Sequence, residues 1–341
     1  MLVGVCDFPS DYAFPPTGYG GIERWLWAVA VGARRAGAAV HLLGPRWRAE
    51  LADHWTLRPV RLEGLSPADQ AARVLRGDGY DLLVVGHEYP SLPGWRAVAD
   101  TVGAEIATFQ HSSTFAHRPD AFDGRRSRLY TYSDEMGERY AAHHPTQELA
   151  VHLGLDEVEP PARPGDGLLW LGRIDNEKAP HLAIRAAALL GRHITLAGPI
   201  FDSGYVDRYR HLFSAPHVTL AGEIGGQAKS HLISNARALV YTCAREYLEA
   251  GAATFGESLR AGTPVAALAW RPGTCAQAAL CPDSGAIALI GPDADDEATA
   301  HALARVTDHA ATLRAPDVQD IGVSRFDPER HFHALAIAWP W

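Results

Sequence analysis

The sequence is poor in the residues that mark several classes of protein. It contains only four cysteines, Cys6, Cys243, Cys275 and Cys281, with no C-x2-C pair, so neither a zinc finger nor a disulfide-rich secreted scaffold is indicated. Cys275 and Cys281 could meet in space, but a reduced, cytoplasmic protein is the better default. No H-x3-H pair lies in a predicted helix that would hold zinc.

Long apolar runs and long basic runs are also missing. No stretch approaches the ~18 apolar residues that span a bilayer, and the segment Met1 to Asp7 lacks the basic region of a signal peptide. The net charge is −9, from 31 Lys and Arg against 40 Asp and Glu. The sequence contains no block of five or more basic residues. We therefore expect no transmembrane segment and no nucleic-acid partner.

What the 341 residues do contain is an alternation of apolar runs with helical patterns, long enough for two domains. This alternation predicts an α/β fold with parallel, doubly wound sheets, in which ligands bind at the carboxyl ends of the strands. Strands are predicted at residues 2–6, 39–43, 81–85, 104–109, 129–133, 148–152, 167–171, 193–197, 218–221, 238–241 and 264–268. Helices are predicted at about 22–36, 135–142, 206–213, 227–235, 294–307 and 327–338, with one more that carries Glu257 and stops at Gly262.

A glycine-rich turn, Gly18-Tyr-Gly20-Gly21, precedes the first predicted helix. A dinucleotide-binding protein would carry G-x-G-x-x-G here, and the second strand would end with an acidic residue for the adenosine ribose. This strand instead ends Leu43-Gly-Pro-Arg46. A nicotinamide oxidoreductase is therefore disfavoured, and the glycines form either a ligand-binding loop or an ordinary tight turn.

Two glutamates bracket a turn of small residues in the second half of the chain. Glu249 and Glu257 have seven residues between them, and the predicted strand 238–241 precedes both. Glu249 and the first amides of the following helix are thus expected at the carboxyl edge of a sheet. Helix N-terminal amides bind anions, while carboxylates accept hydrogen bonds from hydroxyl groups. The stretch therefore predicts a ligand with both phosphate and hydroxyl groups, as in a nucleotide sugar.

Glu249 and Glu257, followed by Ala261-Gly-Thr-Pro-Val265, resemble the E-x7-E signature of retaining GT-B glycosyltransferases of family 4. The resemblance implies two facing Rossmann-like domains with a cleft between them. Residues 1–157 would form the acceptor-side domain, with a C-terminal helix at 325–341 packing back on it. Residues 158–324 would form the domain that binds the nucleotide sugar.

Three other motifs occur in the order of that family: Gly20-Gly21, His111 after a strand, and Gly172-Arg173 with Lys178. The resemblance implies that Arg173 and Lys178 neutralise the donor pyrophosphate. A planar guanidinium and a mobile ammonium suit that charge, through bonds worth about 1.5 to 3 kcal/mol each. In the alternative interpretation, both cations pair on the surface with the acidic residues between them, at positions 175 and 177.

The resemblance further implies that Glu249 accepts hydrogen bonds from sugar hydroxyls and Glu257 from ribose hydroxyls, while Ile224 contacts the base. The implied catalytic residues are His111, Arg173, Lys178 and Glu249. The implied donor-binding residues are Gly20, Gly21, Arg173, Lys178, Ile224, Gly251, Ala252, Ala253 and Glu257. The implied acceptor-side residues are His87, Glu88 and His111, both histidines following predicted strands.

The sequence departs from the family pattern after Glu249. An aromatic residue and a glycine usually follow the first glutamate, whereas this chain has Ala250-Gly251-Ala252-Ala253 and then Phe255-Gly256 later. Which amide among residues 251–253 meets the phosphate therefore stays open, and the small residues could admit an unusual donor sugar. Trp270-Arg271-Pro-Gly273 likewise replaces a small polar run.

The function implied is retaining transfer of a sugar from a nucleotide diphosphate donor, UDP by family frequency, to a hydroxyl acceptor. No cofactor and no metal are expected, and Asp293-Ala-Asp295, which has D-x-D spacing, is interpreted as a helix cap. The chain also resembles antibiotic-tailoring enzymes such as those of the avilamycin (orthosomycin) pathway. A nucleotide-sugar 2-epimerase and a non-catalytic nucleotide-sugar binder remain alternatives, and the oligomeric state is open.

Overall fold

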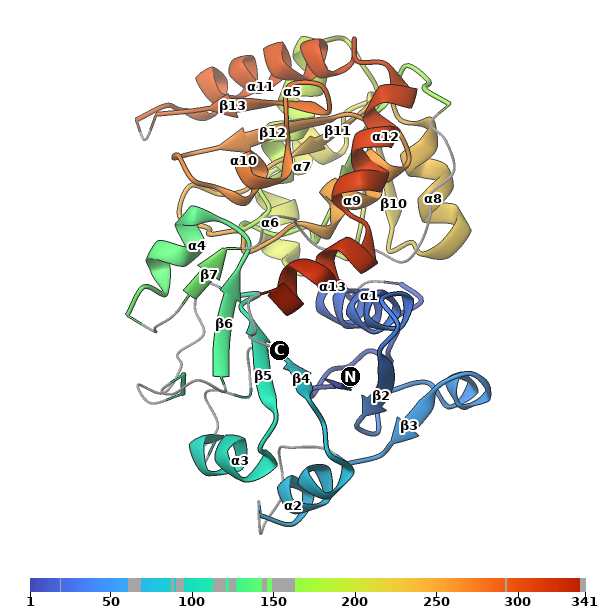
Figure 1. Ribbon diagram of the computed structural model, residues 1–341. Helices are drawn as coiled ribbons and strands as arrows, with labels where there is room; N and C mark the ends of the chain where they lie inside the picture. The colour runs from blue at the N-terminus through green and yellow to red at the C-terminus, as the bar shows by residue number, and fades with distance from the viewer. Residues whose placement is uncertain are drawn as a thin grey trace. The chain divides into compact units, whose positions relative to one another are not determined.

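The computed structural model describes residues 1–18, 20–60, 69–86, 89, 95–112, 121–122, 127–142, 146–148, 163–291 and 293–337, apart from the side chains of 69–72, 146–148 and 337. The chain divides into two compact units. Unit 1 comprises Met1–Pro16, Gly20–Asp156 and Asp327–Trp341, and unit 2 comprises Thr17–Tyr19 and Glu157–Phe326. Each unit is built on one parallel sheet with helices beside it (Figure 1).

The sheet of unit 1 has the order β3-β2-β1-β4-β5-β6-β7, and all its strand pairs are parallel. Its strands are β1 (Leu2–Cys6), β2 (Ala39–Leu43), β3 (Thr56–Arg58), β4 (Leu82–Val85), β5 (Glu105–Phe109), β6 (Ser127–Thr131) and β7 (Thr146–Glu148). Its helices are α1 (Gly21–Arg35), the short 3-10 helix η1 (Ala49–Asp53), α2 (Asp69–Asp78), α3 (Trp95–Val102), α4 (Asp134–Arg139) and α13 (Pro328–Ile337). The apolar residues of β4 are all buried, as expected for a central parallel strand.

The sheet of unit 2 has the order β10-β9-β8-β11-β12-β13, again wholly parallel. Its strands are β8 (Leu168–Leu171), β9 (Ile194–Ala197), β10 (Val218–Gly222), β11 (Ala238–Tyr241), β12 (Val265–Ala269) and β13 (Gly285–Leu289). Its helices are α5 (Pro180–Leu189), α6 (Ser203–Arg208), α7 (Arg210–Phe213), α8 (Gly226–Asn235), α9 (Ala253–Arg260), α10 (Cys275–Ala279), α11 (Asp296–Ala310) and α12 (Ala315–Arg325). The strand order reverses between β8 and β11, so a topological switch point lies there.

The core of unit 2 lies on both faces of its sheet. Successive side chains of a strand point to opposite faces. Accordingly, Leu168 and Trp170 of β8 join one apolar cluster, with α5 and α11, whereas Leu169 joins another, with α9. Burial on both faces explains the uninterrupted apolar sequences of β8, β11 and β12.

The C-terminal segment of the chain packs within unit 1. A Cβ atom added at Gly32 of α1 would lie 2.0 Å from the carbonyl oxygen of Pro328, so α1 and α13 approach each other closely at this point. The indole N–H of Trp25 donates a hydrogen bond of 3.0 Å to Nε2 of His331, and both side chains are buried. Phe332 and Leu335 of α13 are buried as well.

Several predicted boundaries are wrong. The helix expected at 206–213 is two short helices, because the chain leaves the helical conformation at Tyr209. The helix expected at 325–341 begins at Pro328, since Arg325 ends α12 and Phe326 packs in the core of unit 2. The strand expected at 148–152 is β7, which ends at Glu148, and residues 149–152 lie outside the described residues.

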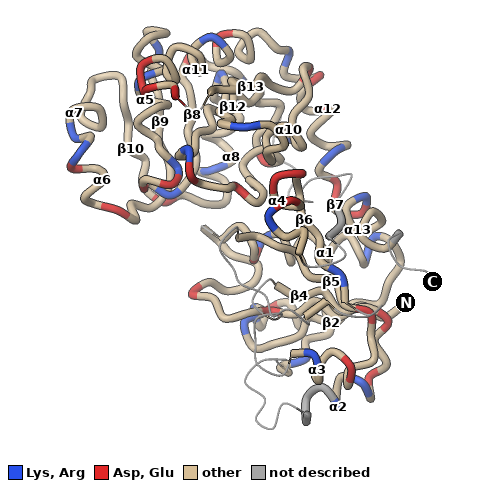
Figure 2. The backbone as a smooth tube through the Cα atoms, turned by 90° about the vertical axis from the view of Figure 1, so that its left-hand side faces the viewer, with Lys and Arg blue, Asp and Glu red and all other residues tan. Residues whose placement is uncertain are grey.

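The distribution of the described charged residues and the state of the cysteines indicate no special surface or disulfide framework. Positions of Lys and Arg are interspersed with positions of Asp and Glu along both units (Figure 2). The four cysteines are free thiols. Among the described residues, no helix is both long enough and apolar enough to cross a membrane.

Candidate functional site

The predicted donor-binding residues of unit 2 gather where the strand order reverses. Strand β8 leads into the turn that carries Arg173 and Lys178, and β11 leads into the loop that carries Glu249. Because β8 and β11 are parallel neighbours, both turns leave the same carboxyl edge of the sheet. Residues that lie 71 positions apart in the sequence are thereby brought into contact.

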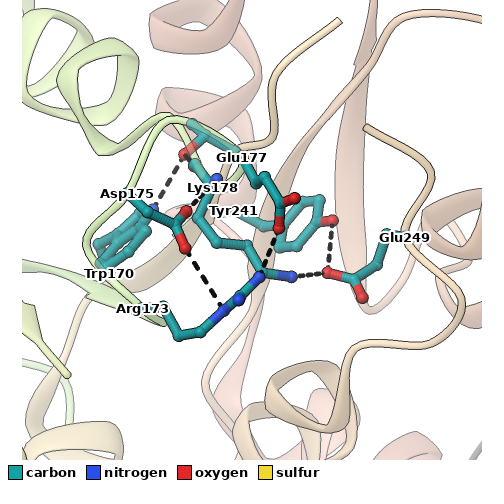
Figure 3. Close-up of polar contacts among 8 residues, drawn as sticks. Trp170, Arg173, Asp175, Glu177, Lys178, Tyr241 and Glu249 are labelled. Atoms are coloured by element: carbon teal, nitrogen blue, oxygen red, sulfur yellow. Dashed lines mark hydrogen bonds and ion pairs between the residues drawn. The ribbon is translucent and has the colours of Figure 1, made fainter. Parts of the chain in front are cut away.

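Lys178 and Glu249 form an ion pair at this edge (Figure 3). The hydroxyl of Tyr241 donates a hydrogen bond of 3.1 Å to the same carboxylate oxygen. The ammonium nitrogen of Lys178 also lies 4.7 Å from the ring centroid of Tyr247, within the range of a cation–π interaction. The Lys178 and Glu249 side chains are 15% and 12% exposed, so solvent screens this pair less than it would a surface pair.

The charge of Glu249 affects both neighbouring tyrosines. It raises the pKa of Tyr247 to about 12, with burial as the second cause and Lys178 opposing the shift. Burial first, and then Glu249, raises the pKa of Tyr241 well above its ordinary value. Both phenols are therefore protonated at neutral pH, and Tyr241 remains a hydrogen-bond donor to Glu249.

Arg173 has different partners. Its guanidinium lies 3.4 Å from Asp175 and 2.6 Å from Glu177, and it sits over the ring of Phe201 at 5.5 Å from the centroid. The surface pairing weighed from the sequence is thus present for Arg173. It is wrong for Lys178, whose ammonium pairs with Glu249 instead.

The segment that carries both cations has a fixed backbone. Lys178 donates its amide hydrogen to Asp175 at 2.9 Å, and its carbonyl accepts from the Thr242 hydroxyl at 2.7 Å. Ala179 has a left-handed conformation, with φ 44, which is unfavourable for a residue with a Cβ atom. Gly198, at φ +147, leaves space for the carbonyl of Gly172, because a Cβ atom there would lie 1.8 Å from that oxygen.

The predicted phosphate-binding amides lie at the start of α9. Ala252 is the N-cap residue, with extended backbone angles, and Ala253 is the first residue of the helix. Among the described residues, no side chain caps this helix end. The orphan amides therefore point from an N-terminus that carries partial positive charge, as a phosphate site requires. Gly251 precedes them in the loop from Glu249.

Glu257 lies within α9, and Lys229 of α8 forms an ion pair with it. The side chains are 5% and 15% exposed. Lys229 was not predicted, because it belongs to no motif and meets Glu257 only through the packing of α8 on α9. Ile224 lies half-buried in the turn that leads from β10 into α8.

In unit 1, the predicted positions lie around the start of α1 and the end of β5. Gly20 is the N-cap residue of α1 and has φ +133, a conformation that favours glycine, and Gly21 is the first residue of the helix. The ring of His111 packs 4.6 Å from that of Trp25 and 5.6 Å from that of Tyr132. His87 and Glu88 lie outside the described residues.

The D-x-D sequence is a helix cap, as interpreted from the sequence. The Asp295 carboxylate accepts a hydrogen bond of 2.8 Å from the amide of Ala298, in the first turn of α11. Within the described residues, no group of three or more His, Cys, Asp or Glu side chains is placed to hold a metal ion.

Comparison with known proteins identifies the fold. No protein-family model and no curated protein sequence matches the chain. Among solved structures, AviGT4, a glycosyltransferase involved in Avilamycin A biosynthesis, is similar over 98% of this chain and 96% of its own, with a TM-score of 0.72 and 21% identity. The chain has the GT-B glycosyltransferase fold.

Two further structures agree with this GT-B assignment. WaaG, a glycosyltransferase involved in lipopolysaccharide biosynthesis, is similar over 99% of this chain and 98% of its own, with a TM-score of 0.61 and 15% identity. Pneumococcal O-GlcNAc transferase GtfA, in complex with UDP and GlcNAc, covers 78% of this chain and 58% of its own, with a TM-score of 0.57 and 12% identity. The fold class predicted from the sequence is confirmed; identities this low establish the fold alone.

Proposed function

We propose that this protein is a retaining, family 4 glycosyltransferase that moves a sugar from a nucleotide diphosphate donor to a hydroxyl acceptor. One observation carries the proposal: Lys178 and Glu249 meet at the switch point of unit 2, on turns that also hold Arg173 and lead to the uncapped start of α9. Cations, orphan amides and a carboxylate at one sheet edge match a ligand with a diphosphate and hydroxyl groups.

In the proposed reaction, the bond between the anomeric carbon and the β-phosphate oxygen breaks, and the acceptor oxygen bonds to the same face of that carbon. The acceptor proton passes to the departing diphosphate, so the products are the glycoside and the nucleoside diphosphate. Negative charge grows on the diphosphate in the transition state. Arg173, Lys178 and the α9 amides stabilise that charge, which makes the largest catalytic contribution electrostatic.

The ion pair with Glu249 gives Lys178 a defined position before the donor binds. Glu249 has a second role in the proposal, accepting hydrogen bonds from the sugar hydroxyls, and Tyr241 fixes its carboxylate for that purpose. Gly251, Ala252 and Ala253 offer amides to the diphosphate, Glu257 accepts from the ribose, and Ile224 contacts the base. Gly20 and Gly21 are also assigned to donor binding, because a turn without side chains lets a ligand approach the backbone.

His111, with His87 and Glu88, is assigned to the acceptor side. UDP is the favoured nucleotide, since similar structures were obtained with UDP. Two structures that are similar over nearly the whole chain belong to proteins involved in Avilamycin A and lipopolysaccharide biosynthesis, which supports a role in natural-product or glycoconjugate synthesis. Protein cations take the place that a metal ion has in other transferases, so we propose that no metal is required.

A thermal-shift screen against UDP, GDP, ADP and dTDP tests the donor class, because a ligand that binds only the folded state raises Tm. Incubation with the matching nucleotide sugar, with and without candidate hydroxyl acceptors, then separates the activities. A transferase forms a glycoside and nucleoside diphosphate, whereas an epimerase alters the sugar with no acceptor. Repeating the assay in excess EDTA tests whether a metal takes part.

Replacing both cations, Arg173→Ala with Lys178→Ala, should lower kcat/KM for release of nucleoside diphosphate by about 10²- to 10⁴-fold, since each charge-assisted bond is worth about 1.5 to 3 kcal/mol. Arg210→Ala is the matched control, because it removes an exposed cation that is paired only locally with Asp207. Near-normal kcat/KM in the double variant would refute the proposed function.

A further inference from the structure

Lysine is almost absent from this protein. Of the 31 Lys and Arg residues, only Lys178 and Lys229 are lysines. Each of them pairs with one glutamate of the E-x7-E motif: Lys178 with Glu249 and Lys229 with Glu257. The second pair is independent of the first, because Lys229 comes from α8 and Lys178 from the turn after β8. Lys229 therefore needs its own explanation.

Stability does not provide that explanation. The Glu257 and Lys229 side chains are 5% and 15% exposed, so pairing them first requires removing both charges from water. Replacing such a buried pair by apolar residues is often neutral or stabilising. In addition, the amide of Lys229 bonds to the carbonyl of Gly225, which places the residue in the first turn of α8, where a cation opposes the helix dipole.

The position of the pair relates it to the nucleoside end of the proposed donor. Lys229 follows the turn that holds Ile224, and Glu257 follows the uncapped start of α9 by one turn. The Lys229 ammonium bonds Oε1 of Glu257. This contact fixes the rotation of the carboxylate, and a carboxylate held in place is a strong hydrogen-bond acceptor for a hydroxyl group.

We propose that Lys229 is a positioning residue that holds Glu257 for the ribose 2′-hydroxyl and makes the site select ribonucleoside over 2′-deoxyribonucleoside diphosphates. The inference rests on the proposed function, and it adds a residue that the sequence motifs do not contain. Lysine suits this place because its compact ammonium delivers a point charge to one oxygen, whereas the planar fork of arginine would engage both.

The test is calorimetric titration of UDP and 2′-deoxy-UDP into the full chain. Unchanged protein should bind UDP about tenfold more tightly, the value of one hydrogen bond to a charged group. Lys229→Met should weaken UDP about tenfold and leave 2′-deoxy-UDP nearly unchanged, so the selectivity disappears. Arg210→Met, which removes an exposed cation from the same unit, should preserve both affinities.

A second comparison covers the case in which Lys229→Met does not fold because Glu257 has lost its ion pair. Glu257→Gln removes that buried charge, so Lys229→Met can be added to it without isolating an anion. If the two residues act together, the double variant and Glu257→Gln should show the same low ribose selectivity, because coupled residues are not additive. Additive losses would contradict the inference.

The outcomes distinguish a failure of the role proposed for Lys229 from a failure of the proposed function. If the unchanged protein binds no nucleoside diphosphate, the proposed function fails and the role of Lys229 fails with it. If UDP binds but Lys229→Met weakens UDP and 2′-deoxy-UDP equally, or weakens neither, only the role of Lys229 is wrong. Tighter binding of dTDP than of UDP to the unchanged protein would also overturn the selectivity.

Discussion

At the scale of single residues, His181 shows how tertiary packing decides the chemistry of a side chain. Its ring stacks on Tyr209 with centroids 4.2 Å apart, its Nδ1 lies 2.6 Å from the Tyr205 hydroxyl, and its Nε2 lies 3.2 Å from Asp296. Burial lowers the pKa of His181 to about 4; Arg185 acts in the same direction, and Asp296 opposes it. The imidazole is therefore neutral in the folded protein near pH 6, although it faces a carboxylate.

This lowered pKa predicts a pH-dependent stability. An unfolded histidine has a pKa of about 6.5, so between there and pH 4 the unfolded chain binds the proton more strongly than the folded chain. The stabilisation is complete above about pH 6.5 and is lost as pH falls to 4, by up to about 3 kcal/mol. Urea unfolding at a series of pH values should show this slope, reduced in His181→Gln. Equal slopes in both proteins would contradict it.

The candidate site could be predicted only where residues of a motif lie at the ends of strands. Arg173, Lys178 and Glu249 are recognisable because each follows a strand that the sequence shows clearly. Lys229 and Tyr247 do not belong to a motif at a strand end. Lys229 reaches Glu257 from helix α8, and Tyr247 contacts Lys178 through a cation–π interaction. Their roles depend on the packing of side chains from separate segments, and no spacing along the chain encodes that.

At the scale of elements, the central strands were the most predictable part of the fold. Strands β1, β2 and β11 were predicted with their observed bounds, because apolar residues dominate all three and β11 is buried throughout. The edge strand β3, Thr56–Arg58, was missed because three residues with exposed or half-buried side chains give no apolar pattern. Strand β13, Gly285–Leu289, was missed for a different reason: its sequence is apolar, but three of its five residues are glycine or alanine, which are depleted in strands.

The close approach of α1 and α13 predicts an unusual response to alanine. Gly32→Ala should destabilise unit 1 by about 1 to 3 kcal/mol, although alanine favours helices, because the new methyl group would overlap the backbone of Pro328. Gly77→Ala in the exposed helix α2 is the matched control, since nothing lies within 4 Å of that Cβ position, and it should be neutral or stabilising. Thermal unfolding measures both, and equal Tm shifts would show that α1 and α13 do not pack as described.

At the scale of the whole molecule, the chain ends in the unit where it began. Phe326 is the last residue of unit 2 and lies in its apolar core, and α13 then buries Phe332 and Leu335 in unit 1. The sequence indicated that a C-terminal helix returns to the first domain. The sequence did not show at which residue the chain passes from unit 2 to unit 1, because Phe326 is apolar like the buried residues of the helix that follows it.

Removal of residues 328–341 should therefore destabilise unit 1 selectively. Trp25 would lose its hydrogen bond to His331 and become exposed, so its fluorescence should shift to longer wavelength. Amide hydrogen exchange should accelerate in β1 and β5 of unit 1, while β8 and β11 of unit 2 provide the control within the same molecule. Uniform acceleration in both units, or in neither, would contradict the assignment of this segment.

The contact between Gly198 and Gly172 restricts which substitutions the turn that carries Arg173 can accept. Two neighbouring turns touch main chain to main chain, so any substitution at position 198 displaces the turn that carries Arg173 before it can offer a new side chain to a substrate. Phe201, on the same turn as Gly198, is instead 56% exposed and already lies against Arg173. Under the proposed function, directed evolution of donor preference should therefore vary Phe201 and leave the glycine pair untouched.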